Sequence, residues 1–369
     1  MKLNPVKIKK IIKNILLYTL VVFILGEFVT RILDKYFVNG KVGSLYSYVV
    51  TNGDSWNFQP SVTVIQPERY GDRSYSLNNY GYRGRNVILE NNKRRILLLG
   101  DSITFGLGVN NSFCYSVLVE NALNETGKDK SNFELINLAL PSYSPHDELA
   151  ALEKIGLGLQ PELIILQLYM NDFQEMKKQN NNVPSTTQPP IRPSLSQRFF
   201  ILKELMFSKS AFLRRIRQIC QMFSHRMFHD FRRTHFINTL NDKEPKERME
   251  LFISNPQDQD IDGFDDIEGM YRLTKEFNIN FLVVLTPNEV QLFNEDYDLI
   301  NKRVRAFCER KNIPFLDPTY SMRSSGNKDK IFCDGLHLSE FGHKFFTDWI
   351  LPVVESNLNI NKQDSNNLW

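Results

Sequence analysis

The sequence predicts an α/β protein with a central parallel sheet and helices on both of its faces. Between residues 94 and 355, short apolar runs typical of buried strands alternate with longer stretches of helical periodicity. The runs are rich in Leu, Ile and Val, as expected for strands that are covered on both faces. The first of them, residues 95–99, is followed directly by Gly100, as expected for a buried parallel strand.

The predicted elements follow one another in a regular order. Buried strands are expected at residues 95–99, 133–140, 162–168, 279–285 and 314–316. Helices are expected at residues 115–123, 148–157, 267–277, 300–311 and 339–355. Before them, residues 79–84 predict turns around short extended pieces. We therefore expect an N-terminal extension at 36–93 that packs on a main domain at 94–355, and a polar tail at 356–369.

The composition is that of an ordinary globular protein. Hydrophobic residues make up 42% of the 369 residues and charged residues 24%. The net charge is only +3, so charge gives no support to a nucleic-acid partner. The cysteines are scattered without a C-x-x-C pair, so neither a zinc site nor a disulfide framework is expected, and no cofactor is predicted. They are Cys114, Cys220, Cys308 and Cys333.

The N-terminus predicts a membrane anchor. Five lysines within the first 13 residues precede a run without charge at 15–25. A helix over 11–33 is long enough to cross a bilayer core of ~30 Å at ~1.5 Å per residue, and Glu27 and Arg31 can pair near its far end. The positive-inside rule then puts the lysines in the cytoplasm and the main domain outside. A cleaved signal peptide and a buried or amphipathic helix are the alternatives, although no small-residue cleavage site follows the run.

One stretch interrupts the alternation of strands and helices. Residues 180–196 are rich in Asn, Pro, Ser and Thr and predict a loop. Residues 197–237 predict one or two basic amphipathic helices, so a helical insertion is expected at about 178–245. A lid or packing element is one interpretation, and contact with anionic lipid headgroups is the other. His225 and His229 have i, i+4 spacing, but no carboxylate pattern accompanies them and no metal site is expected.

Two segments with polar side chains directly follow predicted strands. Gly100, Asp101 and Ser102 follow the first strand, so this serine is lifted out of the sheet near the start of a helix. Asn171 and Asp172 follow the third strand, where an Asn amide can donate a hydrogen bond to a developing oxyanion. The alternative for both segments is that the polar residues only cap a helix or form an Asx-turn.

A third segment, before the last helix, contains Asp334 and His337. Three residues apart on a turn, the carboxylate can hold the imidazole tautomer while the other ring nitrogen takes a proton from a serine. A D-x-x-H motif alone is a weak signal. Its occurrence together with the two earlier segments, each expected at the same edge of the sheet, makes Ser102 a candidate nucleophile.

With these motifs the sequence resembles the SGNH hydrolases, also called GDSL-type, and in particular their membrane-anchored bacterial members. The first block of that family is similar to Gly-Asp-Ser-Ile-Thr-Phe-Gly at 100–106, and the last block to Asp-Gly-Leu-His at 334–337. The turn segment at 79–84 and the N-terminal helix also look like features of the anchored members. The resemblance covers 94–352 and implies the SGNH hydrolase fold, a flavodoxin-like three-layer α/β/α sandwich.

The two middle blocks depart from the family pattern. The second block, of the type Asn-Leu-Gly-x-Pro-Gly-Tyr-Ser, reads Asn-Leu-Ala-Leu-Pro-Ser-Tyr-Ser at 137–144. Ser142 therefore stands where the family has a glycine whose N–H lines the oxyanion hole. The third block, G-x-N-D, matches at Asn171 and Asp172, with Tyr169 in place of the glycine. Serine keeps the N–H group but adopts a positive φ less readily than glycine.

The resemblance implies a role for each residue that matches a block. Ser102 would attack the acyl carbon, His337 would act as general base and then as acid, and Asp334 would orient His337. The backbone N–H groups of Ser102 and Ser142, with the side-chain amide of Asn171, would bind the oxyanion.

Three functions remain open on this sequence. The leading one is an extracytoplasmic serine esterase acting on an O-acyl ester, O-acetyl included, of a sugar, lipid or cell-envelope substrate. The same triad would serve an O-acyltransferase of an envelope polysaccharide, because transfer differs only in the acceptor that attacks the acyl-enzyme. The third is a catalytically silent binding or assembly protein. Ser142 and Tyr169, which replace glycines of the family pattern, support this alternative. In all three, Asp101 and Asp172 are expected to brace their turns.

Overall fold

The structure is a computed structural model of the chain. It describes residues 5–37, 41–42, 44–52, 55–68, 71–89, 92–126, 132–170, 172–173, 210, 212–213, 215–216, 261, 263–358 and 360. The chain forms two compact units, which we name the helical unit and the sheet unit. The helical unit comprises Met1–Tyr48, Thr63–Arg73 and Ser185–Phe228. The sheet unit comprises Val49–Val62, Ser74–Pro184 and His229–Trp369.

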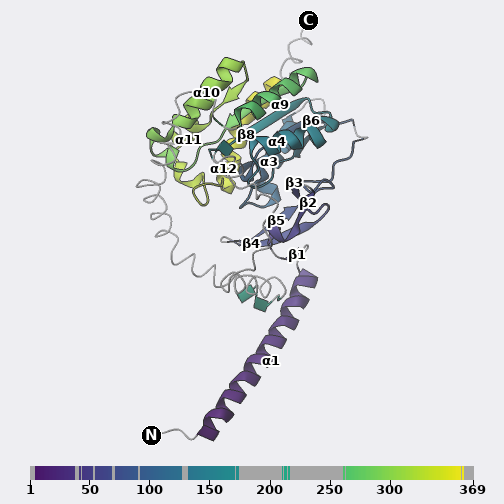
Figure 1. The fold of residues 1–369 in the computed structure, drawn as a ribbon, viewed down its shortest axis with the longest axis vertical. Coiled ribbons are helices and arrows are strands. Elements are labelled where there is room, and N and C mark those ends of the chain that lie inside the picture. The colour runs from purple at the N-terminus through teal and green to yellow at the C-terminus, as the bar shows by residue number, and fades with distance from the viewer. Residues whose placement is uncertain are drawn as a thin grey trace, which may run out of the picture. The chain divides into compact units, whose positions relative to one another are not determined.

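The sheet unit contains a five-stranded parallel sheet in the order β10-β9-β8-β6-β7; Figure 1 labels β6 and β8 of this sheet. Its strands are β6 (Arg94–Leu99), β7 (Phe133–Asn137), β8 (Leu163–Leu168), β9 (Asn280–Leu285) and β10 (Phe315–Leu316). Numbered along the chain from β6, this is the order 2-1-3-4-5 of flavodoxin-like sheets. The predicted α/β class and the flavodoxin-like order are therefore confirmed. In such sheets the order reverses beside the first strand, so the switch point lies between β6 and β8.

Helices cover both faces of this sheet. Those of the sheet unit are α2 (Ser102–Phe105), α3 (Tyr115–Thr126), α4 (Pro145–Ala151), α9 (Phe264–Glu276), α10 (Leu299–Lys311), α11 (Thr319–Arg323) and α12 (Glu340–Asn357). Single turns lie at η2 (Asn111–Phe113), η3 (Leu152–Gly156), η4 (Leu157–Leu159), η6 (Val290–Leu292), η7 (Glu295–Tyr297) and η8 (Lys328–Lys330). Ile96 and Leu98 of β6 share one buried cluster with side chains of α3 and α12. Leu97, which alternates with them, meets η3 on the other face.

The short strands before β6 form smaller pairings. They are β1 (Lys41–Val42), β2 (Val49–Asn52), β3 (Ser55–Phe58), β4 (Thr63–Glu68) and β5 (Gly71–Ser76), with the turn η1 (Leu45–Tyr48). In the sheet unit, β2 and β3 pair as an antiparallel hairpin. The turn predicted at 79–84 is closed by an antiparallel bridge between Leu77 and Arg83. Within this turn, Asn78 Oδ1 accepts hydrogen bonds from the N–H groups of Tyr80 (2.8 Å) and Tyr82 (3.1 Å).

Element boundaries differ from the predictions where polar side chains take over from the backbone pattern. The strand predicted at 133–140 ends at Asn137, whose Oδ1 turns back to accept from the N–H of Ala139 at 2.9 Å. The helix predicted from 148 begins earlier, at Pro145. Proline is favoured in the first turn, and Asp147 Oδ2 accepts from both the N–H (3.0 Å) and the hydroxyl (2.8 Å) of Ser144, which caps the helix.

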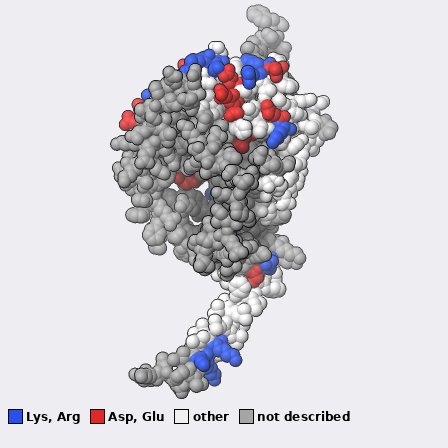
Figure 2. All heavy atoms as spheres, viewed as in Figure 1, with Lys and Arg blue, Asp and Glu red and all other residues white. Residues whose placement is uncertain are grey.

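The helical unit contains the long helix α1 (Pro5–Phe37). Within it, Lys9–Leu33 spans 25 residues with a mean hydropathy of 2.0, which is long and apolar enough to cross a membrane. None of this stretch is buried within the structure. Figure 2 shows an almost uncharged helix with a basic cluster at its N-terminal end, where Lys9, Lys10 and Lys13 are exposed. A signal sequence shares these properties, so the helix alone does not distinguish an anchor from a leader.

A short piece of the predicted insertion contacts α1 inside the helical unit. Glu27 Oε2 accepts from the hydroxyl of Ser210 (2.7 Å) and from the N–H of Phe212 (3.1 Å). The other oxygen of Glu27 accepts from Arg31 at 2.7 Å, so the pairing predicted from their spacing is present. The ring of Phe212 packs against Gly26 so closely that a Cβ at position 26 would lie 2.6 Å from it. The rest of the insertion predicted at 178–245, including its histidines, lies outside the described residues.

Candidate active site

Ser102 stands at the first position of α2, three residues after the end of β6 at Leu99. Gly100 makes the connection, with φ at +151°. A Cβ at this position would lie 2.6 Å from Thr104 Oγ1 and 2.9 Å from the carbonyl oxygen of Gln167. Only glycine fits this approach, because it combines a positive φ with the absence of a side chain. The serine is thereby lifted from the sheet next to the switch point.

Asp101 caps the helix that begins with Ser102. Its Oδ1 accepts from the N–H of Ile103 at 2.8 Å, and the residue itself is buried. The helix-capping role that we considered as the alternative to a catalytic role is therefore present at Asp101. It does not compete with a role for Ser102, because the serine hydroxyl points elsewhere, toward His337.

The segment that carries Asp334 and His337 is a closed turn before α12. An antiparallel bridge joins Phe332 to Leu338, and Gly335 has φ at +91°. Asp334 Oδ1 accepts from the N–H groups of Leu336 (3.1 Å) and His337 (2.8 Å). The same carboxylate thus shapes the turn with one oxygen and leaves the other oxygen for the imidazole.

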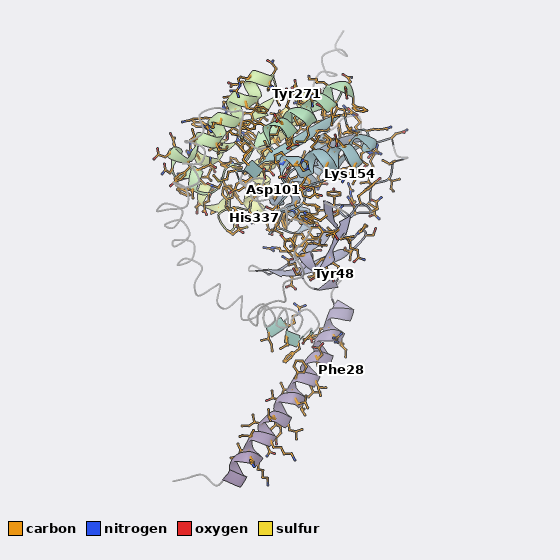
Figure 3. The ribbon with its side chains drawn as sticks, in the orientation of Figure 1. Phe28, Tyr48, Asp101, Lys154, Tyr271 and His337 are labelled. Atoms are coloured by element: carbon orange, nitrogen blue, oxygen red, sulfur yellow. The ribbon has the colours of Figure 1, made fainter. Side chains whose placement is uncertain are left out.

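The three side chains form one hydrogen-bonded chain. His337 Nε2 lies 3.0 Å from Ser102 Oγ, and His337 Nδ1 lies 2.8 Å from Asp334 Oδ2. The first contact joins residues that are 235 positions apart in the sequence, and the second joins residues three positions apart. Figure 3 labels His337 together with Asp101, the neighbour of the serine, in the same region of the sheet unit. The imidazole is mostly shielded, with 18% of its side chain exposed.

The surroundings of Asp334 keep its carboxyl group ionised. Partial burial acts to raise the pKa of Asp334. The hydrogen bonds from the His337 ring and from the backbone of Leu336 and His337 favour the charged form and outweigh that effect. The pKa of Asp334 therefore lies below its ordinary value. A negative charge at this position favours the tautomer in which His337 carries its proton on Nδ1 and leaves Nε2 as an acceptor.

The residue that replaces the family glycine adopts the glycine-like conformation. Ser142 has φ at +66°, in the left-handed region, and lies exposed in the turn after β7. A residue with a Cβ adopts this region at a cost of about 1–2 kcal/mol. The backbone therefore keeps the conformation that a glycine would favour, although the sequence places a serine there. Asn171, the third expected donor of the oxyanion hole, lies outside the described residues.

Asp172 and Tyr169 are buried behind the site. Asp172 Oδ2 accepts from the N–H of Tyr169 at 2.7 Å, which closes their turn after β8. Burial raises the pKa of the Tyr169 phenol well above its usual range, and the charges of Asp101 and Asp334 add to the effect. The tyrosine that stands in place of a family glycine is thus a neutral core side chain close to both carboxylates.

Polar residues below the Ser102 turn form a network that the sequence reasoning missed. Thr104 Oγ1 lies 2.9 Å from the hydroxyl of Tyr115 and donates to Gln167 Oε1 at 2.8 Å. Asn137 Nδ2 donates to the carbonyl oxygen of Thr104 at 2.7 Å. The network ties α2 to α3, β7 and β8. Its signal in the sequence is a lone Gln inside the apolar run Leu-Ile-Ile-Leu-Gln-Leu, since a buried polar side chain requires a partner.

Two further buried titratable groups lie near the site. Glu148 of α4 is fully buried, and neither of its carboxyl oxygens has a hydrogen-bond partner among the described residues. Burial raises its pKa well above the ordinary value, and the negative charges of Asp101 and Asp147 act in the same direction. Burial also lowers the pKa of His343 in α12 to about 3, so this imidazole is a neutral packing residue stacked on Tyr115.

No metal centre is found within the described parts of the chain. No group of three or more His, Cys, Asp or Glu side chains in those parts is placed to hold an ion. His146 lies beside Asp266 at 3.5 Å and is largely exposed. Cys114 and Cys308 are buried free thiols, and Cys333 has intermediate exposure.

Several solved structures resemble this one at low sequence identity. The lipase/acylhydrolase from Enterococcus faecalis shares 16% identity, over 71% of this chain and 96% of that one, with a TM-score of 0.41. The esterase EstA from Pseudoalteromonas sp. shares 11% identity, over 72% and 100% of the two chains, with a TM-score of 0.40. The acetyl xylan esterase AlAXEase shares 15% identity, over 70% and 99%, with a TM-score of 0.40.

The family assignment comes from the sequence match. None of the curated proteins matches this chain significantly. The sequence profile of the GDSL-like Lipase/Acylhydrolase family matches residues 98–345, which is more than half of the chain. The match extends from the end of β6 into α12 and includes Ser102, Asp334 and His337. The chain therefore belongs to the GDSL-like lipase/acylhydrolase family, whose members hydrolyse ester bonds.

Proposed function

We propose that this protein is a serine esterase that cleaves an O-acyl ester, O-acetyl included, of a sugar, lipid or cell-envelope substrate. The observation that carries the proposal is the chain of contacts from Ser102 Oγ to His337 Nε2 (3.0 Å) and from His337 Nδ1 to Asp334 Oδ2 (2.8 Å). A nucleophile, a base within hydrogen-bond reach and a third group that orients the base are the parts that nucleophilic acyl chemistry requires.

In the acylation step, Ser102 Oγ attacks the acyl carbon and passes its proton to His337 Nε2. Asp334, ionised because its pKa is low, stabilises the imidazolium that forms. The tetrahedral intermediate carries its negative charge on the former carbonyl oxygen. We assign the donors to that oxygen as the N–H groups of Ser102 and Ser142 and the amide of Asn171. His337 then protonates the leaving alcohol, and the acyl group stays on Ser102.

In the deacylation step, a water molecule gives its proton to His337 Nε2 and attacks the acyl carbon. Collapse of the second intermediate breaks the bond to Ser102 Oγ, which takes the proton back from His337. The products are the free acid and the original serine. If a sugar hydroxyl replaces the water, the same sequence of steps transfers the acyl group instead, so the acceptor decides between esterase and acyltransferase.

The test of the catalytic assignment uses the full-length protein in detergent. Wild-type protein is expected to react with a fluorophosphonate and to hydrolyse p-nitrophenyl acetate, whereas Ser102→Ala is expected to do neither. Ser324→Ala is the matched control, since Ser324 is exposed and follows α11. If folded wild-type protein is not labelled, both the esterase and the acyltransferase proposals are refuted. If Ser102→Ala keeps its activity, only the assignment of Ser102 as the nucleophile is refuted.

A competition assay separates hydrolysis from transfer. Acyl-enzyme formed from the same ester is offered water with or without a concentrated sugar acceptor, and free acid and acyl-sugar are counted. Release of acid at the same rate in both conditions supports the esterase. A rise of acyl-sugar at the expense of acid supports the transferase.

We further propose that α1 anchors the protein, with the N-terminus in the cytoplasm and the sheet unit outside. The support is the apolar stretch Lys9–Leu33 and the lysines at its start. An anchored chain remains in the membrane fraction after a carbonate wash and keeps its N-terminal tag. Recovery of a shortened, soluble chain would instead identify a cleaved signal peptide.

A further inference from the structure

The short helix α2 leaves carbonyl groups that need partners. An α-helix cannot satisfy its own last carbonyls, and α2 spans only Ser102–Phe105. The backbone N–H of Gly106 lies 3.0 Å from the carbonyl oxygens of both Ser102 and Ile103, and Asn137 Nδ2 donates to that of Thr104 at 2.7 Å. The last carbonyl of the helix, that of Phe105, and the carbonyl of its C-cap Gly106 both accept from Nη1 of Arg83, the former at 2.9 Å.

Arg83 uses its other N–H groups in the same place. Its Nη2 donates to the carbonyl oxygen of Val109 at 2.7 Å and to that of Ser74 at 3.4 Å. Its Nε donates to Asn111 Oδ1 at 2.9 Å. All of these bonds end on carbonyl or amide oxygens rather than on carboxylates. The guanidinium therefore holds together the stretch from Phe105 to Asn111, which directly follows the nucleophile.

The environment of Arg83 immobilises the group. Only 3% of the residue is exposed, and its guanidinium carbon lies 4.7 Å above the ring of Tyr75 and 5.5 Å from that of Phe105. The two rings stack on each other at 5.7 Å, and a cation this close to aromatic rings gains a cation–π attraction. The positive charge also lies at the carbonyl end of α2, where a helix carries partial negative charge. Burying a cation costs free energy unless its N–H groups are hydrogen-bonded. The Arg83 guanidinium can be buried here because oxygen atoms accept from its N–H groups.

We propose that Arg83 is a positioning residue for the nucleophile. By holding the carbonyl end of α2 it sets the orientation of the turn, and with it the Ser102 hydroxyl and the Ser102 N–H that faces the oxyanion. The inference rests on the proposed role of Ser102. Lysine cannot replace this function, because a single ammonium lacks the planar fork that reaches Phe105, Val109 and Asn111 at once.

The experiment compares Arg83→Lys with wild type in the full-length protein. We expect kcat for p-nitrophenyl acetate and the rate constant of fluorophosphonate labelling both to fall about 100-fold, which is the scale of a misplacement of about 1 Å. We expect KM to stay within about threefold, because Arg83 is buried and its N–H groups donate to oxygens of the protein itself.

Arg95 provides a matched control for the loss of a buried arginine. It is 4% exposed and donates to Glu134 (3.1 Å) and to the carbonyl oxygen of Leu159 (3.3 Å). It lies at the start of β6, whereas Ser102 follows the end of that strand. Arg95→Lys is expected to lower the melting temperature and leave kcat within about threefold. An equal loss of kcat in both variants would mean that Arg83 only stabilises the fold, and would overturn the proposal.

Two further variants keep the test decisive. If Arg83→Lys does not fold, Asn111→Ala removes one acceptor and leaves the arginine in place. We expect it to lower kcat several-fold with little change in KM, and an unchanged kcat overturns the proposal. Ser102→Ala distinguishes the two levels of the argument. If it keeps full activity the proposed nucleophile is wrong, whereas an inactive Ser102→Ala beside a fully active Arg83→Lys refutes the positioning role alone.

Discussion

The exchange Asp334→Asn tests the proposed triad most directly, because the structure indicates that asparagine can take the same place. Asp334 Oδ1 accepts from the backbone of Leu336 and His337, and Oδ2 faces His337 Nδ1 at 2.8 Å. In asparagine the oxygen keeps the two backbone bonds, so the amide nitrogen takes the position of Oδ2. The turn should remain folded, with a stability change below about 1 kcal/mol.

The amide nitrogen donates a hydrogen bond, so Nδ1 of His337 must accept one. The ring proton then moves to Nε2, the atom that lies 3.0 Å from Ser102 Oγ. A protonated Nε2 cannot take the serine proton, and the nucleophile is no longer activated. We expect kcat/KM to fall about 10³- to 10⁴-fold, which corresponds to about 4–5.5 kcal/mol at ~1.36 kcal/mol per factor of ten.

The assay is ester hydrolysis by the full-length protein between about pH 6 and 9, a range in which an aspartate with a lowered pKa remains ionised. Titration of Asp334 itself therefore does not contribute to the pH dependence of the wild type in this range. Asp348→Asn, which removes an exposed carboxylate from α12, is the control and should keep wild-type activity. A loss below tenfold for Asp334→Asn, in a protein that melts like the wild type, would refute the tautomer argument.

Three other expectations concern strain, buried charge and the contact on α1. Ser142→Gly should raise the melting temperature, because relief of about 1–2 kcal/mol of left-handed strain exceeds about 0.4–1 kcal/mol of added chain entropy. A lower value in calorimetry would contradict this. Because the pKa of Glu148 is raised in the folded state, its contribution to stability is present below about pH 4.5 and is lost as pH rises through the raised pKa. Glu148→Gln should remove that decline from melting curves at pH 5 and 8, whereas exposed Glu153→Gln should leave it; an unchanged decline in Glu148→Gln would exclude Glu148 as the source. Gly26→Leu would place a Cβ 2.6 Å from the Phe212 ring, so it should speed protease cleavage near residue 212. An unchanged rate of cleavage would contradict this.

The fold class and the three site segments are encoded locally, which is why the sequence predicts them. Apolar runs mark the strands, and the polar residues that follow them must lie at the carboxyl edge of a parallel sheet. Ser102, Asp334 and His337 could be chosen because nucleophile, orienting acid and base are recognisable residue types in a recognisable order. The strand boundary at Asn137 was less predictable, since it depends on a side chain that returns to its own backbone.

The role of Arg83 belongs to the tertiary structure alone. In the sequence it is one arginine in a turn segment, and nothing there indicates that it reaches the carbonyls of Phe105 and Val109. The same holds for Glu148, an ordinary helix residue in the sequence whose carboxyl group is buried without a hydrogen-bond partner among the described residues.

The sequence by itself determined that this protein is an α/β chain of the GDSL-like lipase/acylhydrolase family, because strand periodicity and the two outer blocks are short-range patterns. It also determined the apolar stretch near the N-terminus, which depends on composition only. Only the tertiary structure decided that Ser142 keeps a left-handed backbone and that His337 bridges Ser102 and Asp334. A dihedral angle and a hydrogen bond depend on where distant segments meet, and that is set by the packing of the whole sheet and its helices.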